Sequence, residues 1–130
     1  MYERYMICEE TVRNICDGDS PSGFALDVRI AYYRGIVLSM VDGIEVSVDG
    51  ETFDRDAISF AVRDRVYSLD ELLEADTDRW EFGERANLRV KKPGGLDPGP
   101  HELHVAQELR IPYMPGGRLR GVDTKQVEVS

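Results

Sequence analysis

Residues 92–115, KPGGLDPGPHELHVAQELRIPYMP, place a turn rich in glycine and proline directly before a long alternating strand. Successive residues of a strand point to opposite sides, so the apolar side chains of this strand fall on one face. These side chains are Leu103, Val105, Leu109 and Ile111. The stretch contains no pattern typical of a nucleophile, a metal site or a phosphate loop. It therefore predicts scaffold and docking surface.

The rest of the chain repeats this alternation between turn signals. The predicted strands are residues 24–30, 36–41, 44–48, 58–62, 80–82, 86–91, 101–111 and 122–129. Short alternating strands separated by frequent turns are typical of sandwiches. We therefore predict an all-β fold, an antiparallel β-sandwich of jelly-roll or immunoglobulin-like type, with one short helix.

Local sequence signals predict two turns and the start of a helix. Asp-Gly pairs at residues 42–43 and 49–50 predict two-residue hairpin turns, because both positions tolerate a positive φ. Ser68 followed three positions later by Glu71 fits a capping box, which predicts a helix over residues 69–75.

One predicted strand, residues 36–41, is apolar on both faces. A two-residue turn at 42–43 puts Ile36, Leu38 and Met40 on the face that an antiparallel sandwich usually leaves wet. Covering them is worth on the order of 4–6 kcal/mol, so some surface should cover them. The helix or the N-terminal segment could do so, and a second chain could do so equally well.

Length and charge limit the class of protein. A chain of 130 residues fits one domain, residues 1–130, with a core that needs no disulfide or metal. Its formal net charge of −9 argues against a nucleic acid partner, which needs a basic face. No apolar run reaches the roughly 20 residues that cross a bilayer, and the opening lacks the pattern of a secretion signal. We expect a cytoplasmic protein with no membrane partner.

Candidate catalytic groups are few. His101 and His104 lie three apart on a predicted strand, hence on opposite faces, where they cannot share a metal ion. Cys8 and Cys16 are expected to be reduced, as is usual inside cells. The acidic loop at residues 17–19 lacks the longer loop and final glutamate of an EF-hand. We therefore expect no catalytic residue, no metal ligand and no cofactor in this chain.

A partner interface is a better lead than catalysis. Aromatic, methionine and arginine side chains are enriched at interface centres. Tyr113 and Met114 lie between two prolines, which remove backbone donors and so favour a rigid exposed loop. The predicted interface comprises Tyr2, Tyr5, Met6, Ile36, Leu38, Met40, Trp80, Phe82, Tyr113, Met114 and Arg118.

Four segments together make the chain resemble the small (beta) subunit of bacterial C-glycoside deglycosidases. They are RYMICEETVRNI (residues 4–15), GFALDVRIAYYRGIVLSMVDGIEVSVDG (23–50), RWEFGE (79–84) and the opening stretch at 92–115. The resemblance implies a β-sandwich bound to a larger (β/α)-barrel subunit. In that family the barrel carries a histidine base and a divalent metal, often manganese. The complex cleaves the carbon–carbon bond between a 3-oxo sugar and an aromatic aglycone such as a flavonoid.

The resemblance assigns no catalytic residue to this chain. A docked sandwich can order the loops at the mouth of a barrel and exclude water without supplying a reactive group. We expect the arm at residues 2–6 and the loop at residues 111–120 to make that contact. The alternative is a free-standing carbohydrate-binding module, with Trp80, Tyr113 or Tyr33 on an exposed aromatic platform. A structural subunit of another sugar-metabolising complex is more distant.

Overall fold

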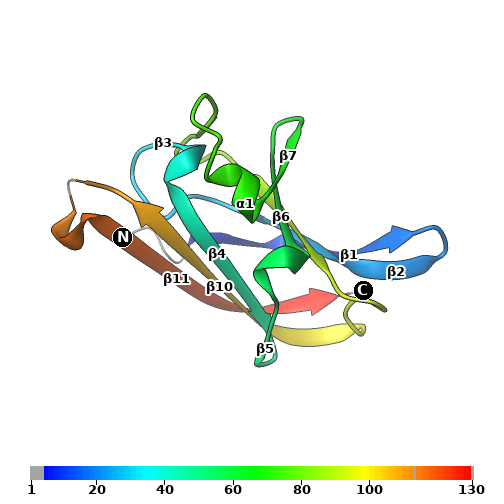
Figure 1. Cartoon of the computed structure of the whole chain (residues 1–130). Helices are drawn as coiled ribbons and strands as arrows, with labels where there is room; N and C mark the ends of the chain where they lie inside the picture. Colours follow the sequence, from blue (N-terminus) through cyan, green and yellow to red (C-terminus); the bar gives the residue numbers. More distant parts are fainter. Residues whose placement is uncertain (1–4, 113, 130) are drawn as a thin grey trace.

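The structure is a computed structural model that describes residues 5–112 and 114–129. Two antiparallel sheets pack around one apolar core (Figure 1). The first contains, in spatial order, β1 (Ile7–Asp17), β2 (Ser20–Val28), β9 (Ala86–Lys91), β6 (Ile58–Val62) and β7 (Arg65–Ser68). The second contains β11 (Arg118–Val129), β10 (Gly99–Arg110), β4 (Val41–Val48) and β5 (Glu51–Thr52). β3 (Ile36–Val37) and β8 (Arg79–Trp80) form a separate pair. The predicted all-β sandwich is confirmed.

β10 organises the second sheet, because it pairs with β11 on one side and β4 on the other. Leu103, Val105 and Leu109 are fully buried on its inner face, as the alternation predicts. Gln107 shares that face and is also fully buried. A polar side chain in the core must find hydrogen-bond partners there. Its partners are the backbone groups of Arg29 and Ala31, in the connection between β2 and β3.

The turn before β10 packs on β1, a strand that the alternation did not predict. Asn14 of β1 donates from Nδ2 to the carbonyl of Leu96 at 2.9 Å and accepts from the N–H of Leu96 at 2.8 Å. Gly95 must be glycine, since a Cβ there would lie 2.6 Å from Oδ1 of Asn14. β1 contains exposed charged residues such as Glu9 and Glu10 in succession, so its sequence does not show the alternation of apolar and polar residues that predicts a strand.

One of the two predicted Asp-Gly turns is confirmed and the other is wrong. Asp49 and Gly50 have φ values of 52° and 86° and join β4 to β5. Residues 42–43 instead lie inside β4, where Asp42 is the extra residue of a bulge opposite β10. The bulge lets Val41 and Ile44, three positions apart, both face the core.

The predicted strand at residues 36–41 is also wrong. β3 ends at Val37, and a 3₁₀ turn covers Leu38–Met40. The N–H of Leu38 donates to the carbonyl of Asp78 at 2.9 Å, so this backbone binds the segment after the helix rather than a sheet neighbour. Leu38 is fully buried and Ile36 is 6% exposed. The chain itself therefore covers these side chains.

The predicted helix is confirmed but shorter. α1 covers Leu69–Leu72 and contacts β4, β6 and β7, so it bridges one open side of the sandwich. Ser68 Oγ accepts from the N–H of Glu71 at 3.1 Å, and Glu71 Oε1 accepts from the N–H of Ser68 at 2.8 Å. The capping box is thus confirmed. Within residues 5–112 and 114–129, no helix has the length and apolar character needed to span a bilayer.

Candidate functional site

The connection between β2 and β3 forms part of the wall of a cavity, and Gln107 fixes where the connection leaves the sheet. Gln107 Nε2 donates to the carbonyl of Arg29 at 2.7 Å. Its Oε1 accepts from the N–H of Ala31 at 3.0 Å. The bond to Ala31 is buried and the bond to Arg29 is partly buried, and an unpaired polar group is costly in such surroundings. The core thereby holds the start of the connection in one position.

Beyond this anchor the connection turns outward. Tyr32 is 6% exposed, whereas Tyr33 is 45% exposed. Gly35 then passes close to Glu81, since a Cβ on Gly35 would lie 2.6 Å from the Glu81 Oε1 and 2.9 Å from its Cα. Only glycine allows this approach. The chain then enters β3 beside β8.

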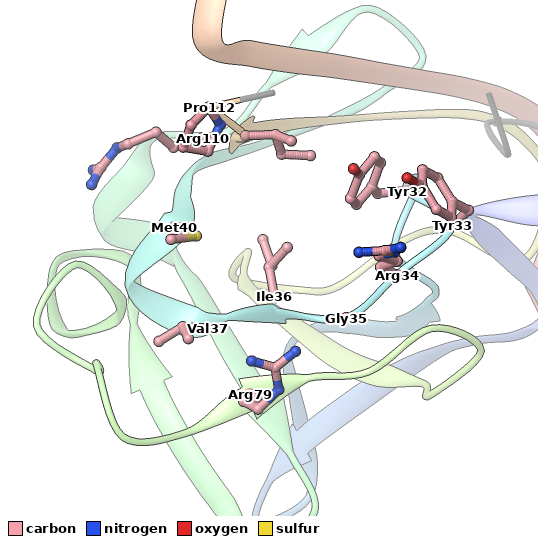
Figure 2. Close-up of a pocket in the computed structure, with 11 residues that line it drawn as sticks. Tyr32, Tyr33, Arg34, Gly35, Ile36, Val37, Met40, Arg79, Arg110 and Pro112 are labelled. Carbon is pink, nitrogen blue, oxygen red and sulfur yellow. The ribbon is translucent and has the colours of Figure 1, made fainter. Parts of the chain in front are cut away.

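The cavity has a volume of about 440 Å³ and lies at the end of the sandwich. Its wall comes from residues 32–37, Met40, Arg79 and the corner at residues 110–112. Figure 2 shows these segments around one open space, with Ile36 projecting into it. Cavities of this size and mixed lining commonly hold small ligands or the anchoring side chains of partners.

Three arginines border the cavity, and their charges are matched unequally. Arg79 Nε lies 2.7 Å from Oε1 of Glu81, and an Arg110 guanidinium nitrogen lies 2.6 Å from Oδ1 of Asp42. Arg34 forms no ion pair with another described residue. Its guanidinium lies instead 5.3 Å from the ring centroid of Tyr33. One positive charge at the cavity is therefore left without a carboxylate from the described part of the chain.

A second hollow of about 400 Å³ lies next to the same connection. Tyr5, Arg29, Ile30, Phe82 and Gly83 line it. Tyr5 and Phe82 are 54% and 52% exposed, so two large aromatic side chains meet solvent here. Exposed apolar surface of this kind is typical of association sites. Together the two hollows give this end of the sandwich an aromatic surface with arginines at its border.

Both histidine side chains form hydrogen bonds within the fold. Both ring nitrogens of His101 face oxygen acceptors at 2.6 Å, Oδ2 of Asp49 and the carbonyl of Asp97. The Asp97 carbonyl, and then the Asp49 carboxylate, raise the pKa of His101 above its ordinary value of 6.5. Nδ1 of His104 lies 2.8 Å from the Thr124 hydroxyl. His101 therefore forms a clasp between the turn that joins β4 to β5 and the turn before β10.

Metal and thiol chemistry find little support in the described residues. No group of three or more histidine, cysteine or acidic side chains gathers among residues 5–112 and 114–129 in a way that could hold a metal ion. Cys8 is buried and Cys16 is exposed, and neither forms a disulfide. Burial raises the pKa of the Cys8 thiol, which disfavours its nucleophilic form.

The predicted interface residues divide by exposure. Met6, Leu38 and Trp80 are fully buried in the chain's own core, so they are not available to a partner. Trp80 packs edge-on against Phe60 at 5.1 Å and donates from Nε1 to the carbonyl of Glu84 at 2.9 Å. The prediction that Met6, Leu38 and Trp80 belong to the partner interface is therefore wrong. Large apolar residues occur both in cores and at interfaces, and the sequence alone does not separate the two. Ile36 is also buried, but it lines the cavity.

The other predicted residues lie at or near the surface. Tyr5 and Phe82 are exposed, and Arg118 is exposed on β11 rather than in a loop. Met40 and Met114 are partly buried against the core. Tyr2 and Tyr113 lie outside the described residues. β10 ends at Arg110 and β11 begins at Arg118, so the corner between them is shorter than the predicted loop.

The sequence reasoning missed Tyr32 and Arg34, and it named Tyr33 only for the sugar-binding alternative. The available signal was the sequence Tyr-Tyr-Arg-Gly at residues 32–35, shortly after β2 ends at Val28.

Comparison with known proteins gives a consistent result. The sequence profile of the C-glycoside deglycosidase beta subunit family matches residues 2–113. A C-glycoside deglycosidase beta subunit from Eubacterium cellulosolvens is 32% identical over 114 residues, which cover 87% of this chain and 78% of that protein. A 3'-dehydrocarminate deglycosidase beta subunit from Microbacterium sp is 37% identical over 95 residues, 72% of this chain and 70% of that protein. A further C-glycoside deglycosidase beta subunit, from Arthrobacter globiformis, is 31% identical over 90 residues and covers 69% of both chains.

The profile match spans most of the chain, and these three relatives align with 69–87% of it. The chain belongs to the C-glycoside deglycosidase beta subunit family.

Proposed function

We propose that this chain is the accessory subunit of a metal-dependent C-glycoside deglycosidase. The complex cleaves the carbon–carbon bond between a 3-oxo sugar and an aromatic, flavonoid-type aglycone, and the catalytic residues lie in a larger (β/α)-barrel subunit. Membership of the beta subunit family carries this proposal. A beta subunit implies at least one other kind of subunit, hence a hetero-oligomer. The cytoplasm is the proposed location.

The proposal places the divalent metal, manganese in the resemblance, in the partner. In this chain, no group of three or more histidine, cysteine or acidic side chains among the described residues could hold a metal ion. When bound in the partner, such an ion would act as a Lewis acid on a substrate oxygen. Both ring nitrogens of His101 are engaged with acceptors, which argues against a role for this residue as a free base.

The aromatic end of the sandwich is the proposed contact with the barrel. It combines exposed Tyr5 and Phe82 with the cavity beside Tyr33 and the corner at residues 111–117. Docking this end against the mouth of a barrel would bury apolar surface and exclude water from the reaction. The sandwich would thus support catalysis by shaping and shielding the partner's site.

Co-expression with a candidate barrel subunit tests the proposal. We expect the two chains to co-elute from a size-exclusion column, and we expect cleavage of an oxidised C-glucoside only when both are present. Full activity of the barrel subunit alone, or of this chain alone, would contradict it.

The alternative, a free-standing carbohydrate-binding module, keeps one supporting observation. Tyr33 is exposed beside a cavity, as a sugar-stacking residue should be. Trp80, the other described candidate for such a platform, is buried and cannot stack on a sugar. Tight binding of glucosides by the isolated chain, without any barrel partner, would favour this alternative.

A further inference from the structure

The cavity beside Tyr33 has the features of a ligand site in its own right. A hollow at the end of a β-sandwich is not by itself evidence of a ligand site. Three observations set this one apart: an unmatched guanidinium, two tyrosine rings and an apolar floor. We propose that the cavity binds a planar aromatic anion, with Arg34 as the residue that binds its carboxylate or phenolate group.

The charge pattern supports an anion. In a chain of formal net charge −9, seven of the twelve described arginines form ion pairs with carboxylates. Arg79 and Arg110 do so at the border of the cavity, through Glu81 and Asp42. Arg34 does not form an ion pair with any described residue, and Figure 2 shows its side chain beside the two tyrosine rings. A guanidinium presents several donors in a planar fork that fits a carboxylate.

The rings support a planar aromatic group. Tyr32 and Tyr33 have ring centroids 4.5 Å apart with planes inclined by 57°. The Arg34 guanidinium lies 5.3 Å from the Tyr33 centroid. Aromatic ligands stack favourably both on tyrosine rings and on a guanidinium plane. An aromatic ring placed here could therefore contact both kinds of surface at once.

The apolar side chains that line the cavity indicate that the bound anion has an apolar ring system in addition to its charged group. Ile36 and Ile111 are 6% and 3% exposed and line the cavity together with Met40. Methionine packs well against aromatic rings because its side chain is flexible and polarisable. The volume of about 440 Å³ exceeds that of a single ring, so it accepts a fused or linked ring system.

The aglycone of a C-glycoside is the natural occupant, since it is aromatic and carries acidic phenol or carboxyl groups. This identification rests on the proposed function, but binding of the anion itself does not. A different occupant of similar chemistry is an acidic side chain of the barrel subunit. The experiment below separates the two.

The test uses the full chain with two probes of the same shape, 2-naphthoate and its neutral counterpart 2-naphthamide. Binding is measured by calorimetric titration and by saturation-transfer NMR. Arg34→Gln removes the charge and keeps a polar side chain. Arg13→Gln is the matched control, because Arg13 is an exposed arginine on β1 that donates to the carbonyl of Thr11 rather than to the cavity.

We expect the wild-type chain to bind 2-naphthoate more tightly than 2-naphthamide. Arg34→Gln should weaken naphthoate binding about tenfold, as loss of one charge-assisted hydrogen bond does, and should change naphthamide binding little. Arg13→Gln should match the wild type. Equal affinity for both probes, no saturable binding, or unchanged naphthoate affinity in Arg34→Gln would overturn the proposal.

Co-elution of the same variants with the barrel subunit completes the experiment. If Arg34→Gln lowers co-elution and leaves naphthoate affinity unchanged, the cavity contacts an acidic residue of the partner and the ligand proposal is wrong. If the isolated chain binds naphthoate through Arg34 but no barrel subunit co-elutes, the accessory-subunit function fails and the ligand site stands.

Discussion

The carboxylate of Asp123 accepts a hydrogen bond from the backbone N–H of Ile7 at 3.1 Å, and this bond joins the edges of the two sheets. Ile7 opens β1 and Asp123 lies on β11, the edge strands of the first and second sheets. Lys125 Nζ donates to the carbonyl of Ile7 at 3.2 Å and lies 3.8 Å from the Asp123 carboxylate. Two side chains thus bind the backbone of Ile7 where no ladder of backbone hydrogen bonds joins β1 to β11.

The contact between β1 and β11 through Ile7 forms a seam between the two sheets. Asp123→Ala should weaken this seam and destabilise the fold. Asp123 is 8% exposed, and the substitution leaves the buried N–H of Ile7 without its acceptor. We expect a loss of about 1.5–3 kcal/mol in the free energy of unfolding, measured by urea denaturation. Glu128→Ala, an exposed acidic residue of the same strand, is the control and should change stability by less than about 0.5 kcal/mol. Equal effects of the two substitutions would show that the seam contributes little.

Gln107→Ala should destabilise the fold and loosen the cavity wall together. It removes the partner of the buried Ala31 N–H and of the Arg29 carbonyl, whose bond is partly buried. We expect a cost of at least about 2 kcal/mol in the free energy of unfolding. Amide hydrogen exchange at Ala31 and in the connection that follows should accelerate more than exchange in β6. Uniform acceleration in both regions would mean that Gln107 does not specifically hold the connection.

The His101 clasp predicts a pH dependence with a definite sign. Its two acceptors raise the pKa of His101 in the folded chain, so the stabilisation is complete below the ordinary value of 6.5 and is lost as pH rises through the raised pKa. The N–H of Glu102, and then His101, lower the pKa of Asp49 below 3.8. That contribution is present above pH 3.8 and is lost as pH falls through the lowered pKa. The clasp should be strongest between these two limits.

Thermal unfolding at pH 5.5 and pH 8.5 checks this expectation. His101→Asn should lower Tm by a few degrees at pH 5.5 and by less at pH 8.5. Asp49→Asn keeps an acceptor and tolerates the positive φ at this position, yet removes the charge, so it should reduce the difference between the two pH values. A larger penalty for His101→Asn at pH 8.5 would reverse the predicted sign.

Phe82→Ser should weaken assembly with the barrel subunit. Phe82 is 52% exposed in the hollow that it shares with Tyr5, and removing its ring deletes apolar surface from the proposed contact. We expect an affinity loss of roughly tenfold in the complex and reduced deglycosylation at limiting subunit concentration. Val66→Ser is the matched control, because Val66 is 53% exposed but lies on β7, away from both hollows. Similar losses for both variants would remove the assignment of this surface.

Strand positions were predictable wherever large apolar residues alternate with polar or small ones, as they do in β2, β6, β9 and β10. The alanines on the second face of β2, β6 and β10 are also buried, so only β9 has cleanly alternating burial. The Asp49-Gly50 turn and the Ser68–Glu71 cap follow from local chemistry alone. Local interactions of this kind depend on neighbouring residues, so a single sequence contains them. The family resemblance likewise depends on sequence, and the profile match confirms it.

The β-sandwich class, most inward faces and the family were thus predictable from the amino-acid sequence. Which apolar side chains remain available to a partner depends on the folded chain. Trp80 and Leu38 are buried while Phe82 and Tyr33 are exposed, although all four are similarly apolar. The physical reason is that exposure depends on contacts between residues distant in sequence, such as Leu38 with Asp78 or Gln107 with Ala31. The same long-range contacts bring Arg34, Met40 and Ile111 around one cavity, which no local pattern records.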